Sequence, residues 1–162
     1  MKRDILTLLI IILINAFSCG AQKEYVYNNN GRKETITALE LKEVVFSELI
    51  KNIKQLNSQL PIQIDELTEM HSAILNGSTI NYNYIAYIDS SELSDEDIES
   101  FCNETKKIQK YNLRFLFKQN SDKMPVSEWI RLYKELGIKY NYNYFDANRK
   151  VWARIVVDFE DF

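Results

Sequence analysis

The fold of this chain is decided by residues 67–88, LTEMHSAILNGSTINYNYIAYI, which read as a β hairpin. Leu67 to Leu75 forms one predicted strand, and Thr79 to Ile88 forms the other. Asn76-Gly77 stands between them, and a tight hairpin turn needs residues that accept a positive φ, as Gly and Asn do. This hairpin is the strongest local signal in the sequence, and the remaining elements are assigned outward from it.

Helices are predicted on both sides of the hairpin. Thr37-Ala38-Leu39-Glu40 has the pattern of a capping box and begins a helix that should end near Asn57. Ser94-Asp95-Glu96-Asp97 begins a second helix, with acids in the first turn where the helix dipole favours them. This helix either continues past Asn112 or breaks there. A third, short helix is predicted over Ser127–Leu136.

Two more strands, Ile138–Phe145 and Lys150–Phe159, form a second predicted hairpin. The fold class is therefore α+β: an antiparallel sheet of about four strands, made of two hairpins, with helices packed on one face. Ile80–Tyr84 (INYNY) resembles Ile138–Tyr142 (IKYNY), which admits a duplicated α-β-β unit.

The N-terminus has the layout of a bacterial export signal. Two basic residues precede an apolar run, Ile5–Ile14, that is too short to span a bilayer. Asn15-Ala16-Phe17-Ser18 then leads to Cys19, which stands where the lipobox cysteine of a bacterial lipoprotein would be. We therefore expect residues 1–18 to be a signal peptide and Cys19 to be lipidated. The alternative is cleavage by an ordinary signal peptidase near Ala21, without lipidation.

The polar segment after Cys19 is predicted to connect the lipid anchor to the folded domain. Residues 19–36 are expected to be a flexible tether, although Tyr25-Val26-Tyr27 would also suit a short edge strand. Residues 37–162 are long enough for a single domain.

Composition excludes several kinds of partner and site. Removal of Lys2, Arg3 and Asp4 with the signal leaves 18 basic and 22 acidic residues, a net charge of −4. That charge argues against nucleic acid as a partner. With Cys19 acylated, Cys102 has no partner for a disulfide, and one His with one Cys makes no zinc pattern. No cofactor motif is present.

The candidate binding surface is a group of strand tyrosines: Tyr82, Tyr84, Tyr140, Tyr142 and Tyr144. The period of two places them on one face and the intervening asparagines on the other. Two interpretations are open. Helices cover the tyrosines as part of the core, or part of the Tyr/Asn surface is exposed and holds a partner.

Other chemistry-bearing residues give weaker signals. His71 and Cys102 would form an enzyme site only if the fold brought them into one cleft. The acids over residues 95–99 do not have the spacing of a calcium loop, and a solvated helix start explains them.

Several short stretches resemble a group of small exported bacterial proteins, lipoproteins among them, of unassigned function. They are residues 60–68 (LPIQIDELT), 80–84 (INYNY), Cys102-Asn103 and 137–146. The resemblance implies export and a compact α+β fold, and it implies no activity. The second cysteine expected near the C-terminus of such proteins is absent from residues 158–162.

Together these features predict a non-enzymatic, membrane-tethered binding protein of the bacterial cell envelope, facing the periplasm or the cell surface, with a protein partner. A narrower version is an immunity or inhibitor protein against a toxin or hydrolase. The rival class is a small enzyme whose site is assembled only in three dimensions.

Overall fold

The computed structural model describes residues 24–29 and 31–162, so the signal peptide and Cys19 lie outside the described residues. In chain order, the elements are β1 (Glu24–Asn29), β2 (Arg32–Thr37), α2 (Ala38–Asn57), β3 (Ile62–Gln63), β4 (Thr68–Asn76), β5 (Thr79–Ala86), η1 (Ser90–Glu92), α3 (Asp95–Gln119), α4 (Val126–Glu135), β6 (Lys139–Phe145), β7 (Val151–Asp158) and η2 (Phe159–Asp161). No helix in this part of the chain is long and apolar enough to cross a membrane.

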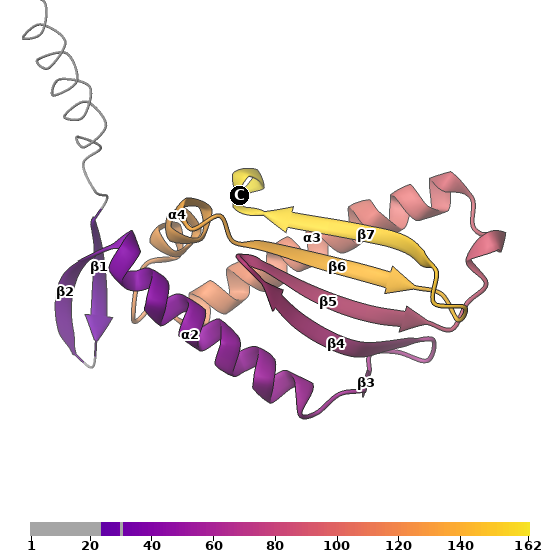
Figure 1. Cartoon of the computed structure of the whole chain (residues 1–162). Coiled ribbons are helices and arrows are strands. Elements are labelled where there is room, and N and C mark those ends of the chain that lie inside the picture. Colours follow the sequence, from indigo (N-terminus) through magenta and orange to yellow (C-terminus); the bar gives the residue numbers. More distant parts are fainter. Residues whose placement is uncertain (1–23, 30) are drawn as a thin grey trace, which may run out of the picture.

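The main sheet has five strands in the order β3-β4-β5-β6-β7, with α3 behind it in the view of Figure 1. The α+β class and both predicted hairpins are confirmed: β4 pairs with β5, and β6 with β7, each antiparallel. The first hairpin turns at Gly77-Ser78, and Gly77 has a φ of +58°. Gly in this conformation carries no Cβ penalty, as the turn requires.

The prediction of a fully antiparallel sheet is wrong at its centre, where β5 and β6 are parallel. Two helices, α3 and α4, connect these strands, and such a crossover returns the chain in the same direction. The sequence NYNY at residues 81–84 pairs in register with NYNY at residues 141–144. Identical side chains therefore stack on each other, as in other parallel in-register pairs.

This register explains the repeated motif without a duplication. In an α-β-β repeat, β4 would correspond to β6 and β5 to β7. The similar sequences lie in β5 and β6, which are not equivalent positions. We conclude that the motif reflects like-with-like pairing between neighbouring strands.

Both long helices begin where predicted, α2 with the predicted capping box and α3 with a second capping box at Ser94. The side chain of Thr37 accepts a hydrogen bond from the Glu40 N–H, and Ser94 accepts one from the Asp97 N–H. The helix α3 is continuous through Asn112, so the alternative of a break there is excluded. Its 25 residues carry it along the whole sheet.

The N-terminal segment differs from the predicted flexible tether. From Glu24 onward it is the antiparallel hairpin β1–β2, which lies beside α4 at one end of the molecule (Figure 1). Tyr25 is only 1% exposed and belongs to the core. The alternative of a short strand at Tyr25–Tyr27 is therefore the one that the structure supports, and the folded body begins before residue 37.

The open edge of β4 is closed by a side chain. β3 covers only Glu69 and Met70, which leaves the rest of that edge without a strand partner. At Ala73, Asn57 takes the place of a strand: its Nδ2 donates to the Ala73 carbonyl at 2.7 Å, and its Oδ1 accepts from the Ala73 N–H at 2.9 Å. This contact fixes the end of α2 to the sheet and occupies the open edge of β4 at Ala73.

Candidate functional site

The predicted tyrosine surface lies in the core. Tyr84, Tyr140, Tyr142 and Tyr144 are all less than 10% exposed, and Tyr82 is half-buried. Rings stack across the parallel pair, with 4.8 Å between the centroids of Tyr84 and Tyr144. Burial raises the pKa of Tyr144 to about 12. The interpretation of these tyrosines as an exposed binding surface is therefore wrong, because helices cover this face.

The asparagines occupy the opposite face of the sheet and form a row of hydrogen bonds. Arg154 Nε donates to Asn143 Oδ1 at 3.1 Å, and Asn143 Nδ2 donates to Asn83 Oδ1 at 3.0 Å. Asn83 Nδ2 then donates to Ser72 Oγ at 2.9 Å. Each amide group is occupied by its neighbours, so the row is a structural ladder that holds four strands in register.

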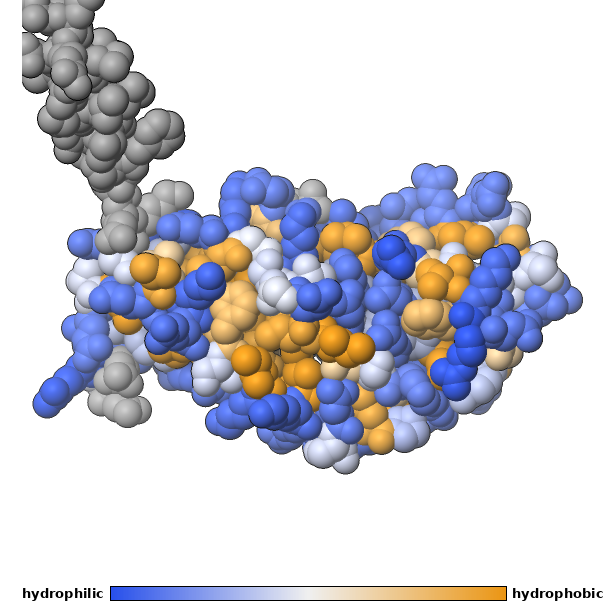
Figure 2. Space-filling view, viewed as in Figure 1, coloured by the Kyte–Doolittle hydropathy of each residue, from blue (hydrophilic) through white to orange (hydrophobic). Residues whose placement is uncertain are grey.

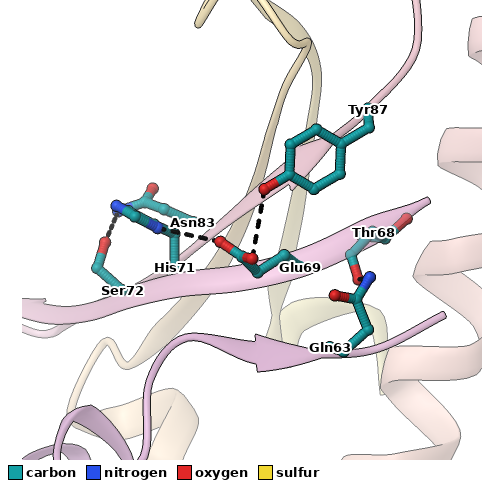
Figure 3. Close-up of polar contacts among 7 residues, drawn as sticks. All are labelled: Gln63, Thr68, Glu69, His71, Ser72, Asn83 and Tyr87. Atoms are coloured by element: carbon teal, nitrogen blue, oxygen red, sulfur yellow. Dashed lines mark hydrogen bonds and ion pairs between the residues drawn. The ribbon is translucent and has the colours of Figure 1, made fainter. Parts of the chain in front are cut away.

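His71 lies on β4 at a break in the strand register, and its side chain contacts that of Glu69 on the same strand. Figure 3 shows His71 and Tyr87 both directed at the carboxylate of Glu69. The His71 Nδ1 to Glu69 Oε1 distance is 3.4 Å, and the Tyr87 hydroxyl lies 3.3 Å from Glu69 Oε2. The described residues include no group of three or more metal-ligating side chains.

Cys102 is far from His71. It lies on α3 and packs against the core, and burial raises the pKa of its thiol. α3 packs on β7, and two strands separate β7 from β4, a distance of roughly 14 Å at the spacing of a β-sheet. The fold does not bring His71 and Cys102 into one cleft, so an enzyme site built from this pair is excluded.

The structure instead reveals a groove in the helical layer. Residues of β1, α2, α3, α4 and the loop between α3 and α4 line it: Tyr27, Leu41, Val44, Val45, Glu48, Leu49, Asn52, Leu116, Phe117, Asn120, Lys123, Trp129 and Tyr133. Its volume is about 140 Å³. A dry cavity of about 150 Å³ holds benzene, so the groove has room for one large apolar side chain.

Two apolar residues stand open to solvent on opposite sides of this groove. Val44 of α2 is 42% exposed and Leu116 of α3 is 45% exposed, whereas Leu41, Val45 and Phe117 below them are buried. Trp129 is fixed at the wall because its Nε1 donates to the Asn120 carbonyl at 3.2 Å. The groove therefore combines a buried apolar floor with an accessible apolar rim.

Apolar surface is not confined to the groove. Figure 2 shows apolar residues gathered near the middle of one face of the molecule, over α2 and the adjoining strand ends. On α2, Leu39 and Ile50 are 66% and 44% exposed. α2 thus presents apolar side chains on more than one side, which favours a role in contact with another molecule.

The N-terminal hairpin forms one wall of the groove and is held in place by α4. The Tyr25 hydroxyl donates to Glu135 Oε2 at 2.8 Å, and the Arg131 guanidinium lies 4.4 Å from the centre of the Tyr25 ring. Arg131 Nη2 also donates to the Glu24 carbonyl at 2.9 Å. These contacts position Tyr27, two residues along the strand, at the groove.

Part of this site is visible in the amino-acid sequence. The spacing of Leu41, Val44, Val45 and Leu49 indicates one apolar stripe, and a stripe of that width is normally buried throughout. The pattern identifies the apolar face of α2. It does not show that α3 stands far enough away to leave part of that face open.

No protein-family model and no curated protein matches the sequence. Among solved structures, the fold resembles a "putative secreted protein" of Pseudomonas aeruginosa, with 13% identity, a TM-score of 0.50 and coverage of 73% of this chain and 93% of that one. The type II secretion system pilotin AspS of Vibrio cholerae aligns with 17% identity, a TM-score of 0.43 and coverage of 77% and 99%. The pilotin EpsS of Vibrio vulnificus aligns with 12% identity, a TM-score of 0.42 and coverage of 74% and 94%. At these identities the likeness is one of fold.

Proposed function

We propose that this protein is a non-enzymatic, membrane-tethered binding protein of the bacterial cell envelope, and that its groove holds an apolar side chain of a partner protein. The observation that carries the proposal is the groove itself: an apolar socket with an exposed rim, formed by well-packed elements. A buried apolar anchor in a preformed pocket is the usual centre of a protein interface.

The shape of the site favours a helical segment as the bound element. The groove lies between α2 and α3, and a third helix can rest along two neighbouring helices with its apolar stripe inward. Glu48 and Lys123 lie among the lining residues and offer one charge of each sign to the polar flanks of such a helix. An immunity or inhibitor protein would use the same groove against a toxin or hydrolase.

Site-specific photocrosslinking tests the groove. A photoreactive phenylalanine analogue at Val44 should join the full chain to one partner protein in the native envelope. The matched control carries the analogue at Ile74, which is 52% exposed on β4. Equal crosslinking from Val44 and Ile74, or none from Val44, would contradict the groove as the binding site.

The membrane tether is tested separately by Cys19→Ala. Lipidation requires the cysteine thiol, so the variant should leave the membrane fraction or remain as an unprocessed precursor. Fractionation followed by mass spectrometry of the N-terminal peptide provides the measurement. An unchanged, processed and membrane-bound variant would show that Cys19 is not the anchor.

A further inference from the structure

The outward face of α3 carries a row of exposed apolar side chains that the groove does not use. Ile108, Tyr111 and Phe115 are 57%, 70% and 52% exposed. Their spacing of three and four residues places them on one side of the helix. None of them lines the groove, so this row is a separate surface.

The charge of this part of α3 is strongly positive. Residues 105–121 contain no acid and five basic residues: Lys106, Lys107, Lys110, Arg114 and Lys118. Lys107 and Lys118 stand four residues before and seven residues after Tyr111, so they share its face. The whole chain has a net charge of −3, which makes this a local concentration of positive charge on an acidic protein.

We propose that this face of α3 rests on an anionic lipid surface. A helix with exposed aromatic and aliphatic residues flanked by lysines has the chemistry of an interfacial helix. Tyr111 and Phe115 would lie at the level of the headgroups, while the ammonium groups of Lys107 and Lys118 contact lipid phosphates. Charge complementarity selects this occupant, because an anionic bilayer offers a continuous surface of the opposite sign.

The position of the β1–β2 hairpin agrees with this orientation. The Asn28 N–H of β1 donates to the Lys123 carbonyl at 2.8 Å, just beyond the end of α3, and the hairpin lies at that end of the molecule (Figure 1). If Cys19 is the anchor, as proposed above, Glu24 is held within about 17 Å of the lipid by five residues. The basic half of α3 is then close to the membrane without any rearrangement.

The test uses the full chain reconstituted in vesicles. Because the lipid anchor holds every variant at the vesicle, the measured quantity is contact of α3 with the lipid surface and not binding of the protein to the vesicle. A polarity-sensitive fluorophore is placed at Tyr111→Cys, or at Ile74→Cys on the sheet as the control position. The vesicles contain phosphatidylcholine alone, or phosphatidylcholine with about 30% phosphatidylglycerol. We expect a blue shift from Tyr111 on the anionic vesicles only, reversed by salt, and no shift from Ile74.

Charge removal quantifies the contact. Lys107→Gln with Lys118→Gln should lower the ratio of docked to undocked protein about 25-fold. Lys51→Gln with Lys54→Gln on α2 makes the same change in charge and should leave the ratio unchanged. The proposal is overturned if the Tyr111 probe responds equally to both vesicle types, if the Ile74 probe shifts as much, or if both double variants behave alike. These outcomes leave crosslinking at Val44 unaffected.

Discussion

Tyr140→Ala should lower the free energy of unfolding by about 4 kcal/mol, the usual loss for removal of a large buried aromatic side chain. Tyr140 is 4% exposed, its ring faces Tyr82 at 6.3 Å and Phe159 at 6.2 Å, and its hydroxyl hydrogen-bonds to Tyr133. A loss of this size is a large part of the stability of a small domain. Urea denaturation followed by circular dichroism measures it.

Two further variants make the result interpretable. Tyr140→Phe keeps the ring and removes only the hydroxyl, so we expect a loss of about 1 kcal/mol and a folded protein. Tyr111→Ala removes a tyrosine that is 70% exposed and should change stability by less than about 0.5 kcal/mol. A Tyr140→Ala protein that keeps its stability but no longer binds its partner protein would show that the strand tyrosines contact the partner and would contradict their assignment to the core.

Much of this fold could be predicted from local patterns. Gly77 identifies the hairpin turn, and the alternation in β5 separates tyrosines from asparagines. Capping residues Thr37 and Ser94 mark the starts of α2 and α3. These signals depend on residues a few positions apart, where the chemistry of one segment decides its own structure.

The features that the sequence did not predict depend on distant residues. Tyr25 folds into the core because its hydroxyl meets Glu135, 110 positions away. The parallel pairing of β5 with β6 is set by residues 60 positions apart, such as Asn83 and Asn143. A polar, Asn-rich segment and a repeated NYNY motif are both ambiguous until such contacts are known.

The candidate site was predicted on the wrong surface for a related reason. Alternation shows that the tyrosines share a face, but it does not show whether helices cover that face. Once α2 and α3 pack on it, the accessible apolar surface shifts to the helices, at Val44 and Leu116. The helices that bury the tyrosine face of the sheet therefore carry the apolar side chains that remain accessible.

Val44→Glu should weaken partner binding at least about 100-fold while the protein stays folded. Val44 is 42% exposed in the free protein, so a carboxylate there remains hydrated and changes stability by less than about 1 kcal/mol. In the complex the same carboxylate would be buried against the apolar side chain of the partner and would lose its hydration, which costs several kcal/mol. Ile74→Glu makes the same chemical change at a side chain that is 52% exposed on β4, outside the groove.

The most direct test of the groove as the binding site is a calorimetric titration of three full-length proteins with the partner segment identified by crosslinking. Wild type and Ile74→Glu should bind with the same affinity, and Val44→Glu should bind at least about 100-fold more weakly. Equal affinities for Val44→Glu and wild type, or a selective loss in Ile74→Glu, would contradict a binding site between α2 and α3.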